Sequence, residues 1–178
     1  MKPGALLWLL YPLVMALGLR WLEPIWLALL ALGLLALRWR VASGAERVWL
    51  PLAALALGFS ALSNSALGLK LYPVMVNLGL LLSFGATLWR GPSMIERLAR
   101  LKEPDLPPSG VAYTRKVTWV WCGFFLANGA MALFTALLGS QQLWTLYNGV
   151  ISYCLIGGLF AGEWCFRQWF IRSNNQPG

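Results

Sequence analysis

The chain has 178 residues, of which 59% are hydrophobic and only 11% are charged, and its net charge is +8. Because a soluble domain is typically about a quarter charged, this composition excludes an ordinary water-soluble domain and predicts an integral membrane protein. The sequence has no histidine, and its 3 cysteines lack metal-ligand spacing, so we expect neither a metal site nor a cofactor.

Apolar runs along the chain predict an all-α bundle of six short transmembrane helices. They lie near residues 5–19, 25–37, 48–62, 71–88, 117–138 and 143–166. The first two runs are shorter than the ~20 residues that a perpendicular helix needs to cross a bilayer. They form either two true spans, which we favour, or a re-entrant pair. Residues 1–172 are thus predicted to be a single transmembrane domain, followed by a disordered polar tail over residues 173–178.

The distribution of positive charge predicts the orientation of these helices. With the N-terminus in the cytoplasm, Arg20 and Lys70 lie outside, and the other twelve of the 14 lysines and arginines lie inside. Because positive residues gather on cytoplasmic loops, both termini are predicted to be cytoplasmic. Topology and attraction to lipid headgroups then explain the positive charge, and no nucleic-acid partner is expected.

Residues 90–116 form the only long polar segment between predicted spans. Ser93 and Glu96 have the spacing of a capping box, which predicts the start of a short helix. Its apolar residues share one face, so we expect an amphipathic helix on the cytoplasmic surface; they are Met94, Ile95, Leu98 and Leu101. Arginines in this segment are candidates for binding a lipid headgroup or a phosphate: Arg97, Arg100 and Arg115. The alternative is a solvated basic loop that only sets the topology.

Polar residues inside the predicted spans are candidates for function, because they are costly in lipid and usually face other helices or a cavity. Asn77, Asn128 and Asn148 lie in three different spans, and Tyr147 and Ser152 lie near Asn148. One interpretation is a polar pocket open toward the outside. The other is a set of hydrogen bonds that join the helices.

Glu163 is the only carboxylate well inside a predicted span, and Arg167 follows it by one helical turn. This spacing allows an intramembrane ion pair on one helix face, which we favour. The alternative is a proton-coupled or acid–base role for Glu163, because burial favours the neutral form of a carboxyl group.

Several motifs in the second half of the chain resemble known bacterial families. Gly91-Pro92-Ser93-Met94-Ile95-Glu96-Arg97, Trp121-x-x-Phe124-Phe125 and Ser140-x-x-x-Trp144 resemble the intracellular septation protein A family. A fuller set resembles a related family of small inner-membrane proteins whose genes often lie beside aryl polyene synthesis genes: Leu71-Tyr72-Pro73, Ile95-Glu96-Arg97, Tyr113-Thr114-Arg115, Tyr147-Asn148-Gly149 and Glu163-Trp164. The resemblance implies a bacterial inner membrane and a lipid-envelope setting, but it supplies no catalytic residues. Residues 1–68 match by hydropathy alone.

Three functions are consistent with these features. We favour a non-enzymatic accessory or scaffold for the synthesis or placement of a lipid-like envelope product, with membrane lipids and envelope-synthesis proteins as partners. A small transporter or flippase for a lipid-like substrate is the alternative. The third is an intramembrane lipid-modifying enzyme, which would act through Glu163, Tyr113 or Tyr147.

Overall fold

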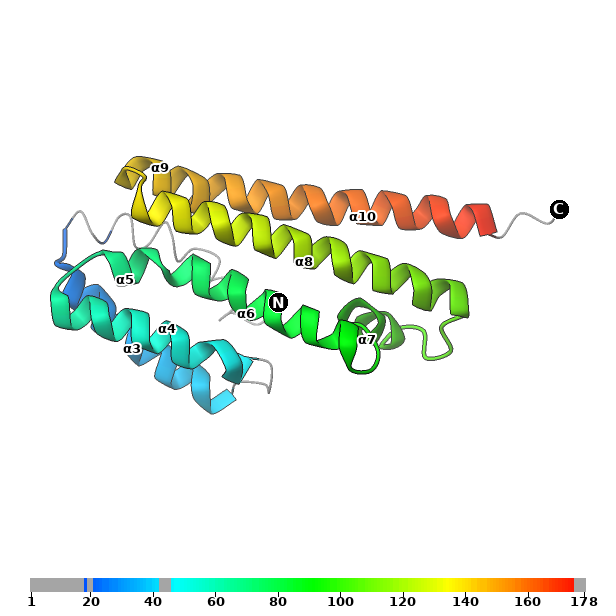
Figure 1. Cartoon of the computed structure of the whole chain (residues 1–178), viewed down its shortest axis with the longest axis horizontal. Coiled ribbons are helices and arrows are strands. Elements are labelled where there is room, and N and C mark those ends of the chain that lie inside the picture. Colours follow the sequence, from blue (N-terminus) through cyan, green and yellow to red (C-terminus); the bar gives the residue numbers. More distant parts are fainter. Residues whose placement is uncertain (1–17, 19–20, 42–45, 175–178) are drawn as a thin grey trace.

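The structure is a computed structural model that describes residue 18, residues 21–41 and residues 46–174. Within these ranges every regular element is helical and no strand occurs, which confirms the predicted all-α class. In chain order the elements are α3 (Pro24–Val41), α4 (Glu46–Ser63), α5 (Leu67–Lys70), α6 (Tyr72–Trp89), α7 (Met94–Arg100), α8 (Pro108–Leu137), α9 (Gln141–Leu146), the π-helical turn η1 (Tyr147–Ile151) and α10 (Ser152–Asn174) (Figure 1).

Most predicted runs coincide with observed helices. The runs near 25–37, 48–62 and 71–88 fall on α3, α4 and α6, each 18 residues long. The run near 117–138 is the later part of α8, which begins at Pro108 because proline suits the first turn of a helix. The run near 143–166 spans α9, η1 and α10. The run near 5–19 lies outside the described residues, apart from Gly18.

The C-terminal end of α10 differs from the expected tail. The helix continues through Asn174, so residues 173 and 174 are helical rather than part of a disordered segment. No proline or glycine occurs between Gly162 and Pro177, and nothing in the sequence therefore interrupts the helix at residue 173. Residues 175–178 lie outside the described residues.

In the described part of the chain, three helical segments are long and apolar enough to cross a membrane: Leu67–Trp89, Pro108–Leu137 and Gln141–Gln168, with mean hydropathies of 1.6, 1.6 and 1.4. Only 28%, 39% and 11% of their most apolar stretches are buried inside the protein. Their outward surface is therefore apolar, which suits lipid and not water. The chain is a membrane protein. Outside this set, α3 carries Arg38 and Arg40 in its last turn, and α4 contains Pro51.

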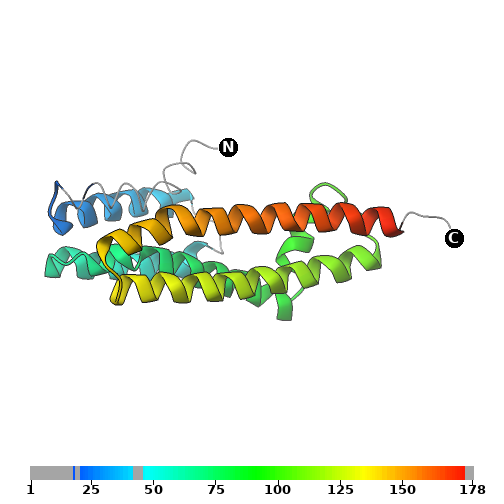
Figure 2. The same ribbon diagram turned by 90° about the horizontal axis from the view of Figure 1, so that it is seen from above.

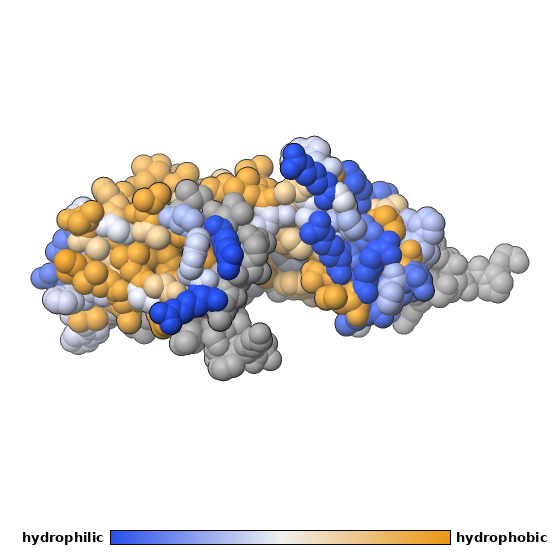
Figure 3. Space-filling view, turned by 90° about the horizontal axis from the view of Figure 1, so that it is seen from below, coloured by the Kyte–Doolittle hydropathy of each residue, from blue (hydrophilic) through white to orange (hydrophobic). Residues whose placement is uncertain are grey.

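The helices lie side by side along one long axis. α3 packs on α4, α4 contacts α6, and α6 contacts α8 over most of its length. α10 runs beside α8 on the far side from α6 (Figures 1 and 2). The end of the molecule that holds α7 gathers hydrophilic side chains, whereas hydrophobic side chains cover the other end (Figure 3).

Two apolar clusters hold these helices together. The first joins residues of α3, α4, α5, α6, α8 and α9. In it Ala28 and Ala53 are fully buried and allow close helix approach, and Trp144 is also fully buried. The second is aromatic. The ring centroids of Phe125 on α8 and Phe84 on α6 are 5.1 Å apart, and those of Trp121 on α8 and Phe160 on α10 are 4.7 Å apart. Large rings thus fill the space between α8 and its two neighbours.

Candidate functional site

Two of the three predicted intramembrane asparagines, Asn77 and Asn128, meet between α6 and α8. Asn128 of α8 donates from Nδ2 to Oδ1 of Asn77 on α6, at 3.1 Å. Asn77 donates in turn from its own Nδ2 to the carbonyl oxygen of Pro73, at 2.8 Å. Gly129 allows this approach, since a Cβ atom there would lie 3.1 Å from the Cβ of Asn77. Both amides are buried, so the bond between them is formed away from water.

The π-helical turn η1 supplies the other half of this network. Tyr147 donates from its hydroxyl to Oδ1 of Asn128, at 2.9 Å. Asn148 donates from Nδ2 to Oγ1 of Thr135, at 3.2 Å, and to the carbonyl oxygen of Trp144, at 3.0 Å. A π turn shifts the helix register by one residue and is common at functional positions. Here two consecutive residues of η1 both bond to α8.

The network is closed upon itself. Asn77, Asn128 and Asn148 are each buried, and Ser152 is buried one turn beyond Asn148. A groove of about 570 Å³ lies elsewhere on α6 and α8 and is lined by none of these residues. Asn128 bonds directly to Asn77, and Asn148 to Thr135, as in the interpretation of hydrogen bonds that join helices. The polar pocket open toward the outside stays a prediction.

Replacing Asn128 with leucine is expected to lower the free energy of unfolding by about 1 kcal/mol, because Asn77 and Tyr147 would each lose their bond to it. Thermal unfolding of the protein in detergent measures this change. Gln142, which is exposed near the same end of the bundle, provides the control. Gln142→Leu should leave the midpoint unchanged. An unchanged midpoint for Asn128→Leu, together with lost function in cells, would instead favour a polar pocket.

Arg97 and Arg100 donate to groups of the connector between α6 and α8, and Arg115 donates to the last turn of α6. Arg97 donates from Nε to the carbonyl oxygen of Pro92, at 2.9 Å. Arg100 forms a 2.9 Å salt bridge with Glu96 and donates from Nη1 to the carbonyl oxygen of Pro104, at 2.8 Å. Arg115 donates from Nη2 to the carbonyl oxygen of Leu88, at 2.8 Å, which satisfies an acceptor in the last turn of α6. Each guanidinium has five N–H groups, so donors remain for an anion.

The predicted capping box at the start of α7 is wrong. The side chain of Ser93 makes no cap hydrogen bond, and its buried hydroxyl oxygen lacks a hydrogen-bond partner among the described residues. Glu96 pairs with Arg100 instead of reaching back to Ser93. The N–H groups of α7 bond to threonines on other helices: Met94 to Oγ1 of Thr87, at 2.9 Å, and Ile95 to Oγ1 of Thr118, at 3.3 Å. Tertiary contacts thus replace the local cap.

The faces of α7 also differ from the expected arrangement. Glu96 is buried against the bundle with only 6% of its surface exposed, whereas Leu98 and Leu101 are 54% and 80% exposed. The salt bridge to Arg100 compensates the buried carboxylate, which is why the charged residue can face inward. Thr87 and Thr118 were not predicted to have this role. A hydroxyl group within an apolar helix needs a hydrogen-bond partner, so both residues could have been identified from the sequence.

Glu163 and Arg167 lie one turn apart on α10, with 3.7 Å between Oε1 and Nε. Tyr113 of α8 donates from its hydroxyl to the same Oε1, at 3.2 Å, and its ring stacks on Phe166 at a centroid distance of 6.0 Å. These contacts tie the start of α8 to α10. In the described part of the chain, no group of three or more His, Cys, Asp or Glu residues could hold a metal ion.

No known family, curated protein or solved structure matches this chain. The resemblance to the septation protein A family and its relative is neither supported nor contradicted by that result, and it stays a prediction.

Proposed function

We propose that the chain is a six-span protein of the bacterial inner membrane with both termini in the cytoplasm. Helix direction supports this topology, because α3, α6 and α10 run toward the end that holds α7, whereas α4 and α8 run the opposite way (Figure 1). Successive spans must alternate in this way. The hydrophilic end in Figure 3 is the one that the positive-inside rule assigns to the cytoplasm. The span near residues 5–19 rests on hydropathy alone.

Single cysteines at Leu101 and Gln142 test this orientation. Both positions are exposed, and they lie at opposite ends of α8. In a variant whose three native cysteines are alanine, an impermeant maleimide added to intact spheroplasts should label Gln142→Cys but not Leu101→Cys. Inverted vesicles should give the reverse result. Labelling of both positions from one side would exclude the proposed topology.

We propose that the protein acts as a non-enzymatic accessory or scaffold for the synthesis or placement of a lipid-like envelope product. The observation that carries this proposal is the polar network between α6, α8 and η1, in which Asn77 and Tyr147 both bond to Asn128. A transporter for a molecule with a polar headgroup needs polar groups that line its path, and here those groups are bound to each other. The resemblance to envelope-associated families supports the setting.

Deletion of the gene in its host, followed by mass spectrometry of envelope lipids, tests this proposal. We expect one lipid-like class to be lost or misplaced and to return when the wild-type chain is supplied. Glutamine in place of Glu163 keeps an acceptor for Tyr113 but cannot exchange a proton. Because an accessory protein needs no proton exchange there, Glu163→Gln should restore the lipid as well as the wild type does. Purified protein in vesicles should not move a fluorescent lipid between leaflets.

Each contrary result has a definite meaning. Failure of Glu163→Gln alone to complement, with normal protein levels, would favour the intramembrane enzyme. Lipid movement above that in protein-free vesicles would favour the flippase. An unchanged envelope lipid profile after deletion would overturn the lipid-related role.

A further inference from the structure

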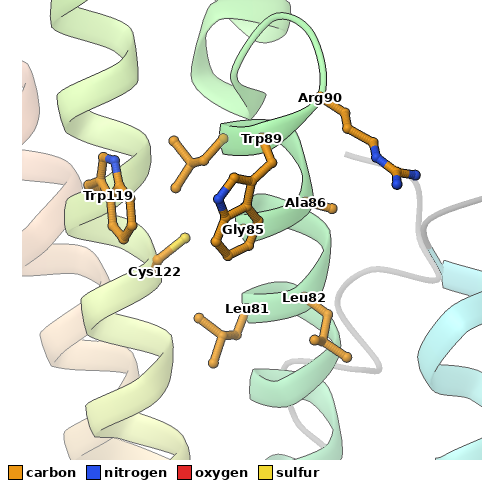
Figure 4. Close-up of a pocket in the computed structure, with 9 residues that line it drawn as sticks. Leu81, Leu82, Gly85, Ala86, Trp89, Arg90, Trp119 and Cys122 are labelled. Atoms are coloured by element: carbon orange, nitrogen blue, oxygen red, sulfur yellow. The ribbon is translucent and has the colours of Figure 1, made fainter.

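A groove of about 570 Å³ lies between the last turns of α6 and the facing part of α8. Its wall on α6 is formed by Leu81, Leu82, Gly85, Ala86, Leu88 and Trp89. Trp119 and Cys122 of α8 form the opposite wall, and the side chain of Arg90, at the end of α6, extends away from them at the edge of the groove (Figure 4). The lining is therefore apolar along the helices and carries one positive charge at the mouth.

The length of the groove matches one leaflet of a bilayer. From Leu81 to Arg90 the chain advances nine residues, which is about 13 Å at the rise of an α-helix. The hydrocarbon of one leaflet is about half of the ~30 Å core. Trp89 and Trp119 are 81% and 56% exposed, and tryptophans of this kind lie at the membrane interface. The apolar floor of the groove then extends from the interface toward the membrane centre.

Positive charge surrounds the mouth of the groove. Arg90 is exposed directly after the last residue of α6. Arg115 is also exposed, and its Nη2 lies 2.8 Å from the carbonyl oxygen of Leu88, which itself lines the groove. The nearest carboxylate on α7, that of Glu96, is already paired with Arg100. An anionic headgroup at the mouth would therefore meet two guanidinium groups, which suit the oxygens of a phosphate.

We propose that this groove binds one acyl chain of an anionic phospholipid, with the lipid phosphate held at Arg90 and Arg115. The chain lies along Gly85 and Ala86, and the two tryptophans flank it near the interface. This inference goes beyond the accessory role and requires only that the helices lie in a membrane. The site can therefore be present even if deletion of the gene leaves the envelope lipids unchanged.

Photocrosslinking in vesicles tests the acyl-chain site. The full chain is reconstituted with a trace of phosphatidylglycerol that carries a diazirine in its acyl chain, and the labelled peptides are identified by mass spectrometry. Labelling is expected to concentrate on the α6 and α8 residues of the groove. Labelling there no stronger than on the outer face of α10 would overturn the proposal.

Filling the groove provides the matched variant. A Cβ atom at Gly85 would meet no atom within 4 Å, so Gly85→Phe places a ring in the groove without a backbone clash. Gly157 on α10 is equally unobstructed but lies outside the groove, and Gly157→Phe is the control. Gly85→Phe should reduce groove labelling to the level of the α10 surface, and Gly157→Phe should not. Equal labelling of the groove in the two variants would contradict the assignment of the acyl-chain site. If either variant fails to fold, the distribution of labelling on the wild-type protein tests the site instead.

Headgroup selectivity tests the role of charge. Phosphatidylcholine with the same diazirine chain keeps the phosphate but adds a choline cation, which the two arginines repel, so it should label the groove roughly tenfold less than phosphatidylglycerol. Arg90→Gln should weaken this preference, because only Arg115 then remains at the mouth. Lys102→Gln, which removes an exposed charge at the same end of the molecule, should keep it. Equal labelling by both lipids in the wild type would overturn the anionic headgroup.

Discussion

Replacing Trp144 with alanine is expected to lower the free energy of unfolding by about 3–5 kcal/mol, the largest loss for a single side chain in this bundle. Trp144 has no exposed surface and is the largest fully buried side chain among the described residues. It lies in the first apolar cluster. Its removal leaves a cavity in that cluster.

The hydrogen bond of Trp144 can be separated from its volume. Nε1 donates to the carbonyl oxygen of Lys70, at 3.1 Å, which connects α9 to the end of α5. Trp144→Phe keeps most of the volume and loses this bond, so we expect a smaller loss of about 1 kcal/mol. Trp164 is 55% exposed on α10, and Trp164→Ala is the control, with an expected change of less than about 0.5 kcal/mol.

Thermal unfolding in a mild detergent, with all three variants at one protein concentration, measures these differences. The expected order of midpoints is Trp164→Ala highest, Trp144→Phe next and Trp144→Ala lowest. If Trp144→Ala and Trp164→Ala unfold together, Trp144 does not anchor the first apolar cluster.

Gly68→Ala is expected to have the second largest effect, about 1–3 kcal/mol of destabilisation, because it overpacks a contact between backbones. A Cβ atom at Gly68 would lie 1.9 Å from the carbonyl oxygen of Ala56 and 2.7 Å from the Cβ of Ser60. A backbone oxygen cannot rotate away as a side chain can. The substitution therefore forces α5 away from α4.

Gly58 on α4 provides the matched control for this glycine. A Cβ atom there would meet nothing within 4 Å. Gly58→Ala should be neutral or stabilise the protein by up to about 1 kcal/mol, since alanine is the better helix former. Opposite shifts of the two unfolding midpoints are the expected result. Equal midpoints would show that α4 and α5 do not approach as closely as the structure has them.

The local sequence predicts where helices occur, but it predicts their first and last residues less accurately. Uninterrupted apolar runs predicted α3, α4, α6 and the central part of α8, because an apolar segment in lipid must satisfy its backbone hydrogen bonds within itself. Hydropathy placed the start of the fifth run near residue 117, whereas α8 begins at Pro108. Tyr113 and Arg115 are helical residues of α8, but because they are polar a hydropathy pattern does not include them in an apolar run.

For the candidate site, the sequence likewise predicted the residues but not their contacts. Composition alone singled out Asn77, Asn128 and Asn148, because amide groups in apolar helices need partners. It did not reveal that Asn128 bonds to Asn77 and Tyr147, since this bonding depends on how α6, α8 and η1 cross. The start of α7 was predicted from a local capping pattern and is in fact held by Thr87 and Thr118.

The sequence by itself determined the helical class, the membrane setting and the residues whose polarity needs an explanation. Each of these depends on a property of a residue or of one continuous segment: its hydropathy, its charge or its hydrogen-bonding groups. Only the tertiary structure decided which polar groups bond to each other, that Glu96 turns inward and that a groove opens beside Gly85. These features depend on the distance between segments far apart in the chain, which packing sets and local pattern does not encode.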